Sequence, residues 1–148
     1  MKNKLDHSFI GKKYTPVIFN VTEERIKLFA KATGQTDPLY YDLNYAKRKG
    51  YPSLLAPLTF LTTVAYEQDD PYKYIRDLNI DMGRFLHANQ EYSYFLTVYG
   101  GDTITMLQSI GDIFDKKDGQ LQFIVFQSTY LNQNEKIVAK AKSTLVVR

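Results

Sequence analysis

Few imidazole groups are available for acid–base chemistry in this chain of 148 residues. It contains 2 histidines, His7 and His87, and no cysteine. A zinc site built from several histidines or thiolates, a cysteine nucleophile and a disulfide framework are therefore excluded within one chain. Because His7 lies close to the N-terminus, His87 is the one imidazole that we consider as a general acid or base. A hydrogen-bonded loop histidine is the plainer alternative for His87.

Two carboxylates stand out by their positions in the sequence. Asp37 precedes Pro38, and an Asp–Pro pair is a turn signal, so a turn is the simplest role for Asp37 and a catalytic base is the alternative. Glu67 follows a long apolar segment, where a solvated helix end is the simplest role and carboxylate catalysis is the alternative.

Tyrosine is the most frequent aromatic residue. The chain has 12 Tyr, 9 Phe and no Trp, which together make 14% of the sequence. Tyrosine combines a large apolar face with a polar tip, which suits strands, pockets and interfaces. Tyr40 and Tyr41 therefore either line a pocket or fill the core. The formal charge of +3 is mild and the basic residues are scattered, so we expect no nucleic-acid partner.

The composition predicts one domain that spans residues 1–148. Hydrophobic residues make up 44% of the chain and charged residues 24%, which is ordinary for a globular protein. No apolar run approaches the ~20 residues that a membrane span needs. The N-terminus has basic residues but no apolar region of a secretory signal after them. We therefore expect no membrane partner and a cytoplasmic location.

Three segments carry helix signals. Thr22 is suited to cap a helix that begins with Glu23 and Glu24, and Gly34 is suited to end it. A shorter helix is predicted over 43–49. Over 57–66 the residues are apolar on nearly every side, which predicts a helix starting at a proline and wrapped by the rest of the domain.

The second half of the chain alternates between apolar and polar residues, as strands do. Predicted strands cover 90–96, 103–114, 121–130 and 137–147, and the last three form an antiparallel meander joined by short turns. We expect an α+β domain in which one antiparallel sheet curls around one helix. Ile104, Met106 and Leu107 are predicted to point into the core from the second of these strands. The third is indicated by Leu121, Phe123, Val125, Ser128 and Tyr130.

Four sequence segments together resemble a known family. Residues 29–40, FAKATGQTDPLY, resemble the hydratase motif of MaoC-like hotdog proteins. The runs GYPSLLAPLTF at 50–60, HANQEY at 87–92 and GDTIT at 101–105 are similar to motifs of the FAS1-like, or MaoC N-terminal, dehydratase branch. The resemblance covers nearly the whole chain, with its segments in the same order.

This resemblance implies a hotdog fold and an acyl thioester carried on coenzyme A or acyl carrier protein, with no further cofactor and no metal. The implied reaction adds water reversibly across a 2-enoyl double bond, using an Asp and a His. A backbone amide at the start of the hotdog helix polarises the thioester carbonyl, because free N–H groups there carry positive potential. Leu58 and Thr59 are the candidate amide donors, and Tyr41, Ala56 and Gln90 are further candidate substrate contacts.

The acid–base pair of the family is replaced in this chain. Gln35 falls on the Asp position and Tyr40 on the His position. A glutamine exchanges no proton near neutral pH, and a tyrosine with a reference pKa of ~10 is a poor base there. The pattern resembles the acyl-binding subunit of two-subunit 3-hydroxyacyl carrier-protein dehydratases. A lone hotdog domain leaves a sheet edge unpaired, so we expect a homodimer or a heterodimer with a catalytic MaoC-like subunit.

Two other activities compete with this non-catalytic hypothesis. The first is an active (R)-specific enoyl-thioester hydratase or dehydratase that uses Asp37 with Tyr40 or His87. The second is a hotdog acyl-CoA thioesterase that uses Glu67. The basic run at 47–49 either ends a helix in solvent or binds the phosphates of coenzyme A or an acidic carrier protein.

Overall fold

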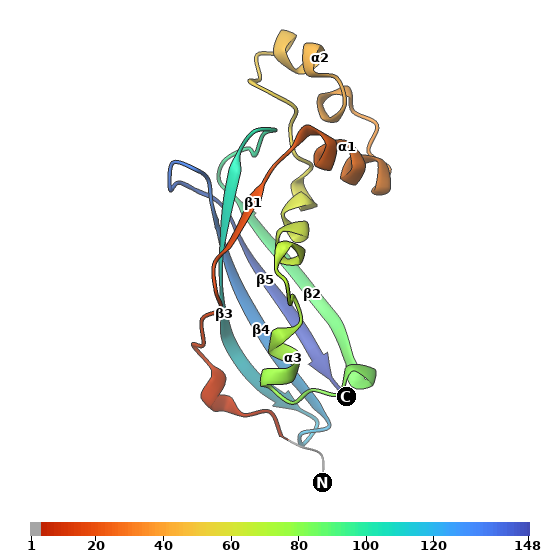
Figure 1. Ribbon diagram of the computed structural model, residues 1–148. Coiled ribbons are helices and arrows are strands. Elements are labelled where there is room, and N and C mark those ends of the chain that lie inside the picture. The colour runs from red at the N-terminus through yellow and green to blue at the C-terminus, as the bar shows by residue number, and fades with distance from the viewer. Residues whose placement is uncertain (1–3) are drawn as a thin grey trace.

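Five antiparallel strands form a single curved sheet in a computed structural model that describes residues 4–148 (Figure 1). Their order across the sheet is β1-β3-β4-β5-β2, which places β1 and β2 at opposite edges. The strands are β1 (Val17–Asn20), β2 (Phe85–Tyr94), β3 (Thr103–Lys116), β4 (Leu121–Leu131) and β5 (Ile137–Val147).

The predicted meander is confirmed by the pairing of β3 with β4 and of β4 with β5. The two outer strands join it from the first half of the chain, β1 beside β3 and β2 beside β5. The start of β2 was predicted at residue 90, but the strand begins at Phe85 because Phe85 and Leu86 already pair with the end of β5.

Within the described residues, seven helical segments connect or cover the sheet. Thr22 caps α1 as predicted, since its Oγ1 accepts a hydrogen bond from Arg25 N at 3.2 Å. Gly34, with φ of 71°, follows the end of that helix. Within residues 4–148 no helix has the length and apolar character that a membrane span requires. The segments are η1 (His7–Phe9), α1 (Glu23–Ala32), η2 (Pro38–Tyr40), α2 (Leu43–Arg48), η3 (Leu58–Glu67), α3 (Lys73–Asp77) and η4 (Met82–Arg84).

The apolar segment predicted as a fully wrapped helix is η3, a 3₁₀ helix that Pro57 precedes. Its buried side chains, Phe60, Leu61 and Val64, form one side of the helix and pack into the main hydrophobic cluster. Leu58 and Tyr66 remain exposed. The prediction of burial on nearly every side is therefore wrong for this chain, because the sheet covers only one side of η3.

The inward face of β4 is formed by every second residue of the strand. Ile124 and Phe126 are buried, whereas Leu121, Phe123 and Val125 lie on the other face and are only partly buried. Ser128 and Tyr130 also face inward, and the alternation runs unbroken from residue 122 to 130. Both faces of β4 carry apolar residues, so alternation alone does not identify the inner face.

On β3 the core includes Ile104 and Met106, as predicted, but Leu107 is exposed. Two consecutive strand residues point to opposite faces, so Leu107 cannot share the inner face with Met106.

The main hydrophobic cluster lies between η3, α1 and the sheet, and a second cluster lies beneath α3. In Figure 1, α1 and α2 lie beyond one end of the sheet, and α3 lies at the other end. The η3 segment runs between them along the sheet. This is the expected arrangement of an antiparallel sheet around a helix.

Candidate functional site

The turn that carries Tyr40 is fixed by two local hydrogen bonds. Asp37 Oδ1 accepts from Leu39 N at 2.9 Å, which caps η2. Tyr41 Oη donates to the backbone oxygen of Gln35 at 2.6 Å. Gln35 and Asp37 are exposed, and Tyr40 is half-buried. Asp37 therefore has the turn role that its position before Pro38 predicts, and its use as a base stays a prediction.

A cavity of about 290 Å³, which we call the helix-start cavity, places Tyr40 beside the beginning of η3. Ala56 and Leu58, two of the predicted substrate contacts, are also part of its wall. Tyr94 Oη donates to the backbone oxygen of Leu58 at 2.6 Å, so β2 and η3 are joined at this cavity. The residues that line it are Tyr40, Leu55, Ala56, Pro57, Leu58, Leu61, Tyr94, Phe95, Leu96, Thr97 and Val98.

The helix start supplies backbone hydrogen-bond donors at this cavity. In a 3₁₀ helix that begins at Leu58, the N–H groups of Leu58 and Thr59 have no intrahelical acceptor. The first helical bond is made by Phe60 N, which donates to Pro57 O at 2.9 Å. Free N–H groups at a helix start stabilise negative charge on a carbonyl oxygen. The arrangement suits the binding of a carbonyl group.

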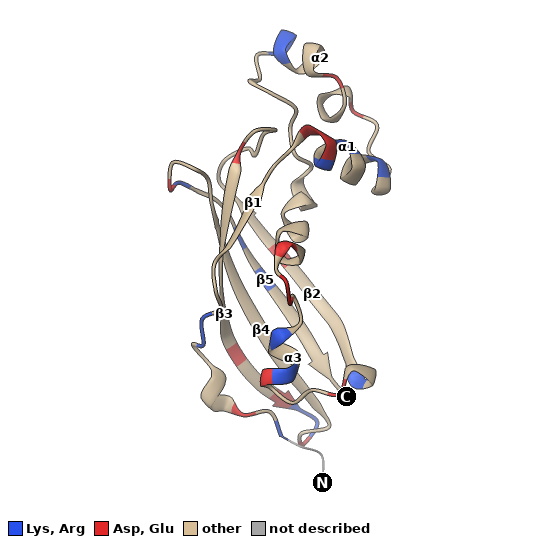
Figure 2. Ribbon diagram, in the orientation of Figure 1, with Lys and Arg blue, Asp and Glu red and all other residues tan. Residues whose placement is uncertain are grey.

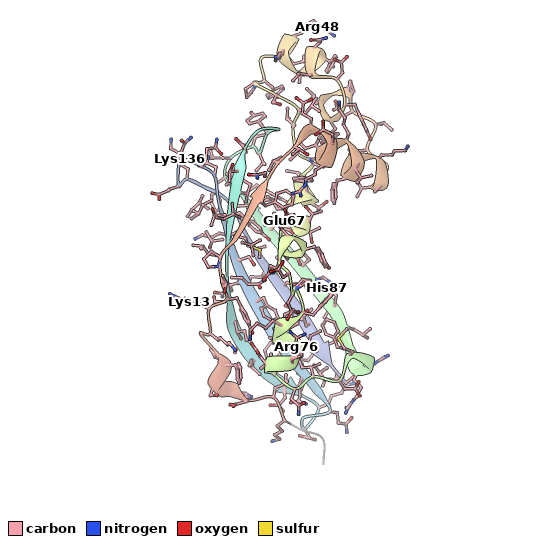
Figure 3. All side chains as sticks on the ribbon, viewed as in Figure 1. Lys13, Arg48, Glu67, Arg76, His87 and Lys136 are labelled. Carbon is pink, nitrogen blue, oxygen red and sulfur yellow. The ribbon has the colours of Figure 1, made fainter. Side chains whose placement is uncertain are left out.

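A second cavity of about 420 Å³, the sheet cavity, lies between η3, α3 and the strands β2 to β5. His87 and Gln90 line it, with His87 Nε2 and Gln90 Oε1 3.3 Å apart. His87 is exposed, and Figure 3 shows it on β2. The two cavities therefore separate the candidate residues, with Tyr40 in one and His87 in the other.

Three tyrosines that line the sheet cavity favour their neutral form. Burial raises the pKa of Tyr92, Tyr74 and Tyr130 above that of a free tyrosine. A phenol with a raised pKa donates and accepts hydrogen bonds at neutral pH but does not act as a base. This cavity is thus equipped to bind polar groups.

Glu67 forms an ion pair instead of lining a cavity. Its carboxylate lies 3.1 Å from Arg25 Nη2, which joins the end of η3 to α1. Neither cavity includes Glu67, which Figure 3 labels on the central helical segment, nor do their walls include Tyr41 or Thr59. The thioesterase role of Glu67 stays a prediction.

A basic cluster lies at the end of α2, formed by Lys47, Arg48 and Lys49. All three side chains are exposed, and Arg48 and Lys49 lie over the ring of Tyr45, at 5.9 Å and 5.5 Å from its centroid. Figure 2 shows this cluster at the end of the molecule where η3 begins, far from α3.

Some residues that line the two cavities were not predicted from the sequence. Tyr94 lies in the predicted strand 90–96, but its hydrogen bond to Leu58 depends on how β2 approaches η3. Gln108 lies on β3 and was not considered, although it is on the same strand face as Met106. Alternation on β3 is the signal that relates these two residues, but only the folded structure shows that they face a cavity.

Comparison with known proteins identifies relatives over almost the full chain. A family model described as FAS1-like, dehydratase domain region matches residues 8–141. A UPF0336 protein of Saccharopolyspora erythraea is 32% identical over 145 residues, which cover 97% of this chain and 92% of the relative. A UPF0336 protein of Streptomyces coelicolor is 34% identical over 107 residues, 72% of this chain and 71% of that protein.

Solved structures of dehydratases have the same fold. The C-terminally truncated HadBC (3R-hydroxyacyl-ACP dehydratase) complex of Mycobacterium tuberculosis matches with a TM-score of 0.79 and 27% identity, covering 97% of this chain and 99% of that chain. A MaoC-like dehydratase matches with a TM-score of 0.83 and 20% identity, over 95% of this chain and 42% of that one, which shows the fold alone. With its curved antiparallel sheet around η3, the chain belongs to the FAS1-like dehydratase family of MaoC-like hotdog proteins.

Proposed function

We propose that this chain is an acyl-thioester-binding subunit of a 3-hydroxyacyl dehydratase or 2-enoyl hydratase, with little or no catalysis of its own. The thioester carbonyl binds in the helix-start cavity, near the amides of Leu58 and Thr59. The basic cluster of α2 lies at the same end of the molecule and suits the phosphates of coenzyme A or an acidic carrier protein.

One observation carries this proposal, namely that the helix-start cavity has no side chain able to exchange a proton easily at neutral pH. Among residues 4–148, no carboxylate and no imidazole lines this cavity. The residue at the position of the family's His is Tyr40, whose phenol is part of the wall. The carboxylate of Asp37 is occupied by the backbone of the turn. The cavity thus supports binding of a carbonyl but not the proton transfers of hydration.

A partner subunit supplies the missing pair in this proposal. Two structural relatives, HadBC and ChsH1-ChsH2 of Mycobacterium tuberculosis, are complexes by name. The edge strand β2 and the uncovered side of η3 are next to the helix-start cavity. A MaoC-like partner that docks there would bring its Asp and His to the bound thioester.

The test measures hydration of crotonyl-CoA and of longer 2-enoyl-CoA thioesters. We expect negligible turnover by the purified chain, and turnover above that of the partner alone once a MaoC-like subunit that retains the Asp and His is added. Robust turnover by the isolated chain, lost in Asp37→Asn, would contradict the proposal and favour an active hydratase.

Thioester binding is measured separately by calorimetry. Ala56→Leu inserts bulk into the helix-start cavity, so we expect at least a tenfold loss of acyl-CoA affinity. Ala32→Leu is the matched control, because Ala32 is exposed at the end of α1 and lines neither cavity. Equal affinities for the two variants would show that the thioester does not bind beside Ala56.

A further inference from the structure

The sheet cavity has polar side chains among apolar ones such as Met106, Phe126 and Leu145. The side chains of Gln90, Gln108 and Ser143 contribute amides and a hydroxyl from three different strands. Two more hydroxyls come from Ser128 and Tyr130, which are 8% and 4% exposed. A cavity that only received a hydrocarbon chain would be lined by apolar groups.

Several of the polar groups that line the cavity also interact with one another. Gln108 Nε2 donates to Ser128 Oγ at 3.4 Å, which is a long hydrogen bond. The phenol of Tyr130 forms side-chain hydrogen bonds with Ser128 and Tyr92. The phenol of Tyr92 also forms one with Thr62 of η3. The polar groups of the cavity thus extend in space from β3 through β4 to β2 and η3.

The sheet cavity adjoins the helix-start cavity. Tyr94 lines the helix-start cavity and Tyr92 the sheet cavity, and their rings stack with centroids 5.5 Å apart. On η3, Leu61 and Thr62 are neighbours in sequence and line one cavity each. The two cavities are therefore neighbours along β2 and η3.

An unsubstituted alkyl tail fits this second cavity poorly. These hydroxyls and amides bond partly to one another, but each can make further hydrogen bonds, which an alkyl chain cannot supply. A tail with an oxygen atom restores those bonds, because Ser and Tyr hydroxyls both donate and accept.

We propose that the preferred ligand is an acyl thioester whose tail carries an oxygen function, which is bound in the sheet cavity by Ser128, Tyr130 and Gln108. This inference rests on the proposed binding of a thioester in the helix-start cavity and adds the substrate class. The oxygen distinguishes the ligand from plain fatty acyl thioesters of the same length.

The test compares the affinities of the purified full chain for octanoyl-, decanoyl- and dodecanoyl-CoA with those for their ω-hydroxy counterparts, by calorimetry. One added hydrogen bond to a buried partner raises affinity about tenfold, so we expect that preference for at least one chain length. Equal or weaker binding of every ω-hydroxy ligand overturns the inference. If no thioester binds at all, the proposed function itself fails.

Two variants test whether Ser128 and Tyr130 cause the preference for ω-hydroxy ligands. Ser128→Ala and Tyr130→Phe are each expected to reduce the ω-hydroxy preference at least threefold, without weakening the binding of the plain thioesters. Thr129→Ala is the matched control, since it removes a hydroxyl from the same strand but on the opposite face, outside the cavity. Circular dichroism checks folding, and a preference that survives both cavity variants contradicts the assignment.

Discussion

Asp37 shows how one residue can have the chemistry of a catalyst and the role of a cap. Its carboxylate accepts a hydrogen bond from Leu39 N, 2.9 Å away, and thereby begins the turn that presents Tyr40 to the helix-start cavity. An asparagine side chain has an oxygen in the same position and caps about as well as an aspartate. Substitutions at Asp37 therefore separate capping from proton transfer.

We predict that Asp37→Asn keeps the stability of the natural chain, whereas Asp37→Ala lowers the free energy of unfolding by about 1 kcal/mol through loss of the cap. Urea unfolding followed by circular dichroism measures both values. Equal destabilisation by the two substitutions would mean that the charge, and not the cap, stabilises the turn.

Single residues differ in how well the sequence predicts their place in the site. Tyr40 and Gln35 were recognised because they stand at fixed positions of a motif. The contact of Tyr94 with Leu58 joins residues 36 positions apart, and no local pattern encodes it. Local spacing predicted the turn, but the walls of the cavities depend on long-range packing.

At the scale of elements, α3 is held to the N-terminal segment by one carboxylate. Asp77 forms ion pairs with Lys12 at 2.7 Å and with Lys73 at 2.6 Å. Hydrogen bonds from Lys12 and then from Lys73 lower the pKa of Asp77 below 3.8. Since α3 and Tyr74 cover the sheet cavity, this cluster helps to position one wall of that cavity.

The lowered pKa gives a stability that depends on pH. The folded state favours the ionised form of Asp77, so its contribution is complete above 3.8 and is lost as the pH falls through the lower folded value. We predict that Asp77→Asn lowers the free energy of unfolding by about 0.5–1 kcal/mol at neutral pH, and that the deficit shrinks in acid. Urea unfolding over a pH series measures it.

The control for this prediction is Asp69→Asn, because Asp69 is exposed and makes no ion pair within residues 4–148. Its unfolding curves should follow those of the natural chain at every pH. An Asp77 deficit that is the same at all pH values would show that the lost charge is not its cause.

The elements differ in how much their sequences reveal. Thr22 and Gly34 mark the limits of α1 by local chemistry, and α1 was predicted closely. The inner face of β4 could not be predicted in this way, because Phe123 and Phe126 are equally apolar. Their order of burial is set by the pairing with β3 and β5, which brings distant segments together.

At the scale of the whole molecule, apolar side chains remain uncovered around the helix-start cavity. Leu58 on η3 is 66% exposed, and Phe95, immediately after β2, is 57% exposed. Both line that cavity, beside the edge of the sheet that no other strand of the described chain covers. Exposed apolar groups next to a free sheet edge indicate a protein interface.

We predict that Phe95→Glu weakens association, because a charge buried in an apolar interface without a partner is strongly unfavourable. Ile18→Glu is the matched control: Ile18 is 65% exposed but lies on β1, at the opposite edge of the sheet. Light scattering coupled to size-exclusion chromatography should show a dimer, or a complex with a MaoC-like subunit, for the natural chain and for Ile18→Glu. Phe95→Glu should run mainly as a monomer. If Ile18→Glu alone dissociates, the interface is at β1, and the helix-start cavity does not face a partner.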